Sequence, residues 1–146
     1  MDKDLFTVFA EGSCPQVLDL LAPQGKPSEW RVDMLTGVFP NLAGRPFRHR
    51  KRFVPASGGF VRGFNVFFGD YRWGYFFLND DAYYLKEKSS LLIDYRRAEN
   101  GLLTRGHILD EVRTTGDKDV LLGRFNLVVF GKPRFVGYFS LTRIIP

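Results

Sequence analysis

The chain has 146 residues, the size of one domain that can bury a core without metals or disulfides. Hydrophobic residues (45%) and charged residues (25%) are at ordinary globular levels, whereas aromatic residues reach 16%. The single cysteine, Cys14, excludes an internal disulfide and a thiolate metal cluster. The charged start has no signal-peptide layout, and no apolar run approaches the roughly 18 residues of a membrane helix. We therefore expect a cytoplasmic protein without a membrane span.

The first 45 residues differ in pattern from the rest. Cys14–Leu21 predicts a short helix, with Pro15 in its first turn and Pro23 after its end. Residues 22–45 are rich in Pro and Gly and carry scattered large apolar side chains, which favours an ordered strap. We predict one domain, in which residues 1–45 form a helical and irregular lead-in strap that closes one end of a barrel, and residues 46–146 form the barrel strands.

From about Pro46 onward, apolar and polar residues alternate with a period of two between short turns. The predicted strands are Phe47–Val54, Phe60–Phe68, Tyr71–Leu78, Tyr83–Lys86, Leu91–Arg96, Val120–Phe130 and Arg134–Ile144. Ile108–Thr114 fits either a strand or a helical turn. A meander of about seven or eight strands tends to close, because closure removes its exposed edges. The predicted fold class is all-β: a small antiparallel up-and-down β-barrel with a short N-terminal helix.

The C-terminal half resembles a group of bacterial hypothetical proteins. The resemblance lies in Leu91–Tyr95, an apolar strand ending in Asp-Tyr, in Leu109–Arg113, and in Leu121–Arg124, a strand ending in Gly-Arg. Lys51-Arg52-Phe53 is similar to a segment of bacterial proteins with a Gly-X-Trp-X-Gly motif, although no such motif precedes it here. In architecture these groups are similar to lipocalins and fatty-acid-binding proteins, of the calycin type. The resemblance implies a β-barrel with one ligand cavity, and it implies no substrate.

The aromatic strands point to the barrel interior. In Tyr71–Leu78, Trp73 and Tyr75 share one face, and the other face is also largely apolar. A strand that is apolar on both faces is either buried on both or lines a cavity on one. The sequence leaves a filled core and a hollow one as alternatives.

Several polar residues interrupt these otherwise hydrophobic strands. A buried charge needs a partner, so Arg124 is expected to lie near Asp94, Asp110 or Glu111. Such groups either orient a ligand in an apolar pocket or form an internal ion pair that fixes the strand register. The candidate ligand-binding residues are Asn65, Trp73, Tyr75, Asp94, Tyr95, Arg124 and Asn126.

Candidates for catalysis are few. Asp94 and His107 are the candidate proton-transfer groups, and His49 would qualify if it faced the cavity, although each histidine also fits an ordinary surface or turn position. No metal-binding motif and no nucleophile motif is present, so no metal and no cofactor is expected.

A basic stretch contributes much of the net charge of +5. Its cationic residues are Arg45, Arg48, Arg50, Lys51 and Arg52. Such a stretch attracts nucleic acid, an anionic lipid surface or an acidic ligand, or it is a solvated strand face that prevents edge pairing. Arg62–Phe68 partly resembles the aromatic strand of an RNA-recognition motif, but the two long helices of that fold are not predicted.

Three functions follow, in order of preference. The first is the binding of a small hydrophobic molecule inside a lipocalin-like barrel, with that small apolar molecule as the partner. The alternative is a cofactor-independent enzyme on the same barrel, such as an isomerase, cyclase or lyase of secondary metabolism. The third is a nucleic-acid-binding module. The sequence does not decide whether the protein is a monomer or a homodimer.

Overall fold

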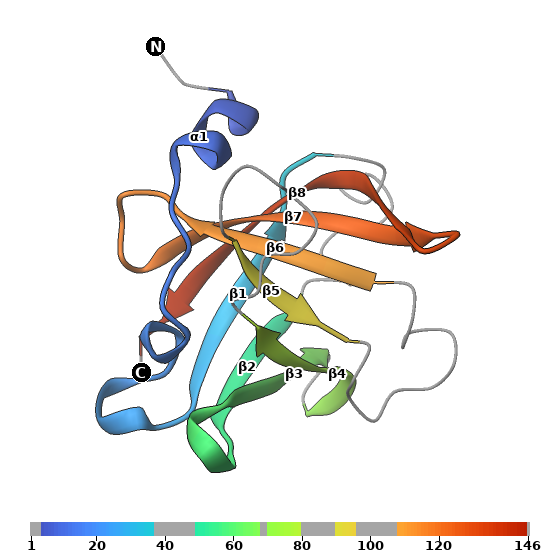
Figure 1. The fold of residues 1–146 in the computed structure, drawn as a ribbon. Coiled ribbons are helices and arrows are strands. Elements are labelled where there is room, and N and C mark those ends of the chain that lie inside the picture. Colours follow the sequence, from blue (N-terminus) through green and yellow to red (C-terminus); the bar gives the residue numbers. More distant parts are fainter. Residues whose placement is uncertain (1–3, 37–48, 68–69, 80–89, 96–107, 146) are drawn as a thin grey trace.

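The computed structural model describes residues 4–36, 49–67, 70–79, 90–95 and 108–145. Within these residues, antiparallel strands form a closed barrel in which each strand pairs with its neighbours in sequence (Figure 1). Pairing of the first strand with the last closes the sheet. The strands are β1 (Ser28–Met34), β2 (Arg50–Pro55), β3 (Val61–Phe67), β4 (Tyr71–Asn79), β5 (Leu91–Asp94), β6 (Ile108–Thr114), β7 (Val120–Val129) and β8 (Lys132–Ile144). The predicted up-and-down barrel is confirmed.

The barrel begins earlier in the chain than expected, because β1 lies inside the predicted strap. Ser28, Trp30 and Val32 in β1 are buried, and the polar residues Glu29 and Arg31 between them alternate to the other face. Pro23, Gly25 and Pro27, which favoured an irregular segment, precede the strand and do not interrupt its ladder, and the other Pro and Gly residues of 22–45 lie outside the described residues. β1 pairs with β2 on one side and with β8 on the other. Closure of the barrel therefore depends on a strand that the sequence interpretation placed in the strap.

The N-terminal helix also lies elsewhere than predicted. Helix α1 spans Leu5–Glu11, and the Asp4 side chain caps it by accepting a hydrogen bond of 2.7 Å from the backbone N–H of Thr7. In the segment predicted as helix, only one turn forms, the 3-10 helix η1 (Val17–Leu20). The residues before it are not helical: Gln16 is extended, and the backbone N–H of Thr114 donates a hydrogen bond of 2.9 Å to the carbonyl of Ser13. A tertiary contact thus overrides the local helical pattern.

Two further predicted segments remain to be compared with the structure. Ile108–Thr114 is a strand, β6, which pairs with β5 and β7. The predicted strand Tyr83–Lys86 lies outside the described residues. The remaining described turns include the short helices η2 (Pro23–Gly25) and η4 (Ser57–Gly59).

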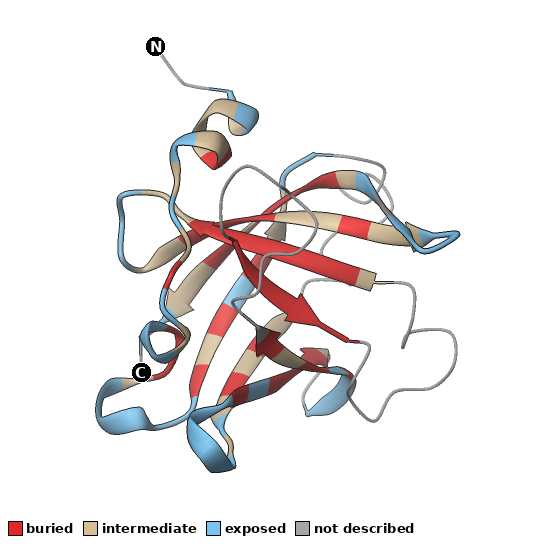
Figure 2. Cartoon of the chain, viewed as in Figure 1, coloured by how far each residue is buried: buried red, intermediate tan, exposed pale blue. Residues whose placement is uncertain are grey.

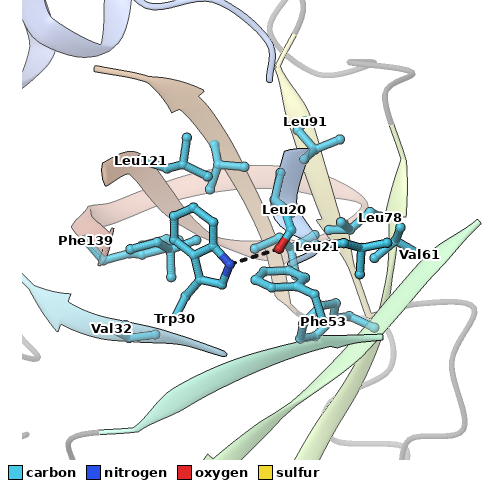
Figure 3. Packing of buried hydrophobic residues seen from close by; sticks show 14 of the residues in the cluster. Leu20, Leu21, Trp30, Val32, Phe53, Val61, Leu78, Leu91, Leu121 and Phe139 are labelled. Carbon is cyan, nitrogen blue, oxygen red and sulfur yellow. Dashed lines mark hydrogen bonds between the residues drawn. The ribbon is translucent and has the colours of Figure 1, made fainter. Parts of the chain in front are cut away.

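The hydrophobic core fills one end of the barrel. Trp30, Phe53 and Phe139 are almost completely buried there, and the side chains of Leu20 and Leu21 enter from η1 and the residue after it (Figure 3). The indole N–H of Trp30 donates a hydrogen bond of 3.1 Å to the carbonyl oxygen of Leu20. The segment around η1 therefore plugs this end.

Burial follows the alternation of each strand. β5 and most of β6 are buried along their length, whereas the hairpin between β7 and β8 becomes exposed towards its tip (Figure 2). Outside the barrel, Phe9 of α1 packs against Leu122 and Tyr138, which covers part of the outer face of β7 and β8. At the end of the barrel opposite to η1, the side chains on the inner face do not fill the interior and leave a cavity.

Candidate functional site

A cavity of about 360 Å³ occupies the barrel interior at the end opposite to the η1 plug. Its wall comes from the last residues of β1, β3 and β7 and from the first residues of β2, β4 and β6, which meet at one end because the strands are antiparallel. The lining residues are Val32, Met34, His49, Lys51, Asn65, Phe67, Trp73, Tyr95, Ile108, Asp110, Phe125, Leu127 and Phe139. Most of this wall is apolar. The barrel is thus filled at one end and hollow at the other.

Four polar side chains meet in this cavity. The Lys51 ammonium donates hydrogen bonds of 2.8 Å to Asn65 Oδ1 and of 2.7 Å to the Tyr95 hydroxyl. Asp110 Oδ2 lies 3.8 Å from Lys51 Nζ, and each of the two side chains is only 3% exposed. Asn65 Nδ2 donates to the Tyr95 hydroxyl over 3.3 Å. These residues come from β2, β3, β6 and the residue after β5, so the closed sheet alone brings them together.

The cluster leaves one hydrogen-bonding atom open. Asp110 Oδ1 is buried and has no hydrogen-bond partner among the described residues. A buried acceptor without a partner costs free energy, so it favours a ligand group that hydrogen-bonds to it. The site is therefore a polar anchor point inside an apolar chamber.

Burial shifts the acid–base properties of this cluster. Loss of hydration raises the pKa of Asp110 to about 7, although the Lys51 charge opposes the shift. Burial also lowers the pKa of Lys51 to about 8, while the Asp110 charge acts in the opposite direction. The pKa of the Tyr95 hydroxyl is raised well above its usual value, mainly by burial. Two adjacent groups in the cavity thus have pKa values near neutral pH.

A glycine in an irregular part of β4 makes room for this cluster. The β3–β4 register shifts between Gly63 and Asn65, and Gly74 there has a φ of +69°. A Cβ atom on Gly74 would lie 2.7 Å from Asn65 Nδ2, which donates a hydrogen bond of 3.2 Å to the Gly74 carbonyl. Glycine is required here both for the left-handed conformation and for the close approach.

Aromatic side chains form the outer part of the cavity. The rings of His49 and Phe67 stack with centroids 4.8 Å apart, and the Trp73 ring lies edge-on to Phe67 at 5.9 Å. Trp73 is 40% exposed, so it reaches from the cavity to the surface. This aromatic rim gives an apolar ligand a surface to contact before it meets the polar cluster.

The structure separates the predicted ligand-binding residues into two groups. Asn65, Trp73 and Tyr95 line the cavity together. The others, which are Tyr75, Asp94, Arg124 and Asn126, are not among its lining residues. Asp94, Arg124 and Asn126 alternate with residues that face the interior, which places them on the outer face of the barrel wall. Tyr75 lies beyond the irregularity at Gly74 and next to the buried Phe76, so it is on the outer face although Trp73, two residues earlier, lines the cavity.

The outer group contacts neighbouring side chains and backbone instead. The ring of Tyr75 packs against Phe64 with centroids 5.8 Å apart. Arg124 lies opposite Glu111 in the β6–β7 register and stacks on the Phe135 ring at 4.7 Å. Asn126 Nδ2 donates a hydrogen bond of 3.0 Å to the Leu109 carbonyl. Of the three carboxylates expected near Arg124, Glu111 is thus its cross-strand neighbour.

The candidate catalytic residues have different positions. Asp94 is buried but alternates with Tyr95, which lines the cavity, so the two side chains lie on opposite faces of the wall. His107 lies outside the described residues. His49 lines the cavity at its rim. Asp110 is the carboxyl group that the cavity holds, and the sequence analysis named it only as a partner for Arg124.

Lys51 is the site residue that sequence reasoning missed most clearly. It lies in the basic stretch, which was interpreted as a partner-attracting patch or as a solvated strand face. In the structure, Arg50 forms an ion pair of 2.8 Å with Glu29 on the outside, while Lys51 points inward. The available signal was its spacing of two residues from Phe53, which is completely buried. Arg45 and Arg48 lie outside the described residues.

A second hollow, of about 800 Å³, lies outside the barrel between the η1–η2 segment and the end of β8. Arg143 in its wall already donates hydrogen bonds to the carbonyl oxygens of Leu21 and Asp19 and to the Asp119 carboxylate. Its principal cation is therefore engaged in holding the plug. The described residues that line this surface form no buried polar cluster comparable to that of the interior.

Within the described ranges, no three His, Cys, Asp or Glu side chains gather closely enough to hold a metal ion. None of the described helices has the length and apolar character needed to cross a membrane. Comparison of the chain with protein-family models, with curated proteins and with solved structures finds no match.

Proposed function

We propose that this protein binds a small, largely apolar molecule inside its barrel, in the manner of lipocalin-like binding proteins. The observation that carries the proposal is the buried cluster of Lys51, Asn65, Tyr95 and Asp110 at an otherwise apolar cavity. Small-molecule sites are usually concave and apolar, with a few convergent polar groups that fix the orientation of the ligand. The closed, up-and-down barrel is compatible with a calycin-type architecture.

The dimensions of the cavity limit the ligand. Its volume of about 360 Å³ is near the lower end of the range of about 300–1,000 Å³ for ligand pockets. The ligand is therefore small, with an apolar body against Phe67, Phe125 and Leu127. A single polar group on it would reach Asp110 or the Tyr95 hydroxyl.

Two neighbouring positions on β7 provide a matched test. Leu127 lines the cavity, whereas Val128 alternates to the other face and is also only half-buried. Replacement of Leu127 by Trp should block the cavity and weaken uptake of a neutral apolar probe, N-phenyl-1-naphthylamine, at least tenfold. Replacement of Val128 by Trp should leave uptake unchanged. Fluorescence titration measures both, and native mass spectrometry identifies any molecule that is purified with the protein.

Equal uptake by both variants would place probe binding outside the barrel interior. A wild-type protein that takes up no probe and retains no small molecule would contradict a binding function for the cavity.

The cofactor-independent enzyme remains a second candidate, and one observation favours it. Asp110 and Lys51 are adjacent, with pKa values of about 7 and about 8, so either could transfer a proton at neutral pH. An isomerase, cyclase or lyase should lose turnover in Asp110→Asn while it still binds its substrate. A binding protein should show only a change of affinity. The nucleic-acid module is disfavoured, because the buried Lys51 amine is not presented to a phosphate backbone.

A further inference from the structure

The Lys51 amine occupies an unusual position for a lysine. It lies inside the barrel, lines the cavity and is 3% exposed, whereas Lys118, on a turn, and Lys132, the first residue of β8, are exposed at the surface. Among the described residues that line the cavity, it is the single primary amine. A lysine desolvated in an apolar pocket is a stronger nucleophile at neutral pH, because its neutral form is favoured. The lowered pKa of Lys51, about 8, agrees with this geometry.

The charges around Lys51 select against an anionic ligand. Asp110 Oδ2 lies 3.8 Å from the amine and already compensates its charge when both groups are ionised. A carboxylate or phosphate entering the cavity would add a second negative charge beside Asp110 at a buried site, which is costly. A neutral carbonyl group adds no charge, and its oxygen is an acceptor for a protonated Asp110. The cavity therefore favours a neutral, carbonyl-bearing molecule over an acid.

We propose that Lys51 binds an apolar aldehyde or ketone covalently, as an imine, within the cavity. This inference rests on the proposed binding function and specifies the chemical class of its ligand. The lone pair of Lys51 Nζ attacks the carbonyl carbon, and protonated Asp110 donates its proton to the carbonyl oxygen. Proton transfer from the nitrogen and loss of water then give the imine. Amine and carbonyl thus yield imine and water, with no change of oxidation state and no further reactant.

The other cluster members act as positioning residues. The Asn65 side-chain oxygen and the Tyr95 hydroxyl hold Nζ at 2.8 Å and 2.7 Å, which fixes the amine facing the cavity. Asn65 itself is held by its hydrogen bond to the Gly74 carbonyl. The open atom Asp110 Oδ1 is the acceptor that remains for the water or hydroxyl group formed in the reaction. The arrangement supplies a nucleophile, an acid–base group and fixed orientation.

The test is reductive trapping in the full-length protein. We would incubate it at pH 7 with octanal and sodium cyanoborohydride, and with glyoxylate, a small charged aldehyde, in a parallel sample. Trapping of an imine adds the mass of the aldehyde less one oxygen atom, and peptide mapping locates it. We expect octanal to label Lys51 at least tenfold faster than Lys118 or Lys132, and glyoxylate to show no such preference. The labelling rate should pass through a maximum between about pH 7 and pH 8, because the step needs both a neutral Lys51 amine and a protonated Asp110.

Two variants make the result specific. Leu127→Trp keeps Lys51 but obstructs the cavity, so it should abolish the preference for Lys51. Lys51→Met should lose the adduct while it keeps the circular dichroism spectrum of the folded barrel. The matched control, Lys118→Met, should label like the wild type.

Probe uptake and adduct formation together distinguish a failure of this proposal from a failure of the proposed binding function. Normal uptake of the naphthylamine probe with no preferential adduct at Lys51 would overturn imine formation and leave non-covalent binding intact. Absence of both probe uptake and adduct would overturn the binding function as well. Labelling spread evenly over the surface lysines would also reject a reactive Lys51.

Discussion

Gly74 shows how one residue sets the geometry of the cavity. Its φ of +69° belongs to the left-handed region, and its carbonyl accepts the hydrogen bond that orients Asn65. Asn65 in turn holds the Lys51 amine. The absence of a side chain at position 74 is thus part of the construction of the polar cluster.

Replacement of Gly74 by Ala should lower the free energy of unfolding by about 2–4 kcal/mol, from backbone strain and from displacement of Asn65. Its Cβ would lie 2.7 Å from Asn65 Nδ2. The control is Gly116→Ala, which has a φ of +99° but no atom within 4 Å of its Cβ, so it should cost only about 1 kcal/mol. Urea denaturation measures both. Equal losses of unfolding free energy in the two variants would mean that backbone strain alone, without the contact to Asn65, accounts for the need for glycine at position 74.

At the scale of elements, the β7–β8 hairpin carries a residue that does not stabilise it. Phe130 is 100% exposed and has a φ of +51°, and Gly131 follows with a φ of +74°. Two successive positive φ values match a type I′ turn, in which Asn-Gly is the preferred pair. Phe is therefore a poor choice for the turn in terms of local conformation.

Replacement of Phe130 by Asn should raise the free energy of unfolding by about 0.5 kcal/mol, because Asn adopts the left-handed conformation more readily and no buried contact is lost. Thermal denaturation followed by circular dichroism is a suitable measurement. Gly131→Ala, in the same turn, should instead be destabilising. A loss of stability in Phe130→Asn would show that the exposed ring contributes a contact in solution.

The plug is a second element whose attachment depends on one side chain. The Arg143 guanidinium lies 4.3 Å above the Trp30 ring and donates hydrogen bonds to the carbonyl oxygens of Asp19 and Leu21. It also pairs with Asp119 at 3.1 Å. A planar, forked cation is needed to reach these partners together.

Arg143→Lys should therefore lower the free energy of unfolding by about 2 kcal/mol, even though the charge is kept. Arg134→Lys, an exposed substitution in the same strand, should stay within about 0.5 kcal/mol of the wild type. Hydrogen exchange of residues 17–21 should increase selectively in Arg143→Lys. Unchanged exchange there would contradict the role of Arg143 as the link between β8 and the plug.

At the scale of the whole molecule, the buried pair makes stability depend on pH. The pKa of Asp110 is raised from 3.8 to about 7, so the folded protein retains a proton that the unfolded chain loses, and stability falls between about pH 4 and pH 7. The pKa of Lys51 is lowered from 10.5 to about 8, so stability rises again from about pH 8 to pH 10.5. The contribution of this pair to the free energy of unfolding is therefore smallest between about pH 7 and pH 8.

Replacement of both residues, as Lys51→Met with Asp110→Val, should remove both the fall in stability between about pH 4 and pH 7 and the rise between about pH 8 and pH 10.5. At pH 7.5 the double variant should be at least as stable as the wild type, because an apolar pair avoids the desolvation of two charges. Asp110→Val alone leaves the buried Lys51 amine without its carboxylate partner and should cost about 3 kcal/mol at that pH. Urea titrations at pH 5, 7.5 and 10 distinguish these outcomes. A double variant that keeps the wild-type pH profile would assign the dependence to other groups.

Much of the barrel was predictable from the sequence, and so was part of the site. Alternation and turn residues correctly indicated β3, β4, β7 and β8, and the polar interruption at Asn65 pointed into the cavity. The same criterion also selected Arg124 and Asn126, which lie on the outer face. Alternation reveals that two faces of a strand differ, but it does not reveal which face is inside when both carry apolar residues.

The sequence by itself determined the class of fold: its period-two strands and short turns force an antiparallel meander, and such a meander removes its edges by closing. The tertiary structure decided that Ser28–Met34 is the closing strand and that Lys51 and Asp110 face each other. Those facts depend on the register between segments far apart in the chain, and a shift of one residue would turn each side chain to the other face. Only the closed sheet fixes that register, and with it the chemistry of the cavity.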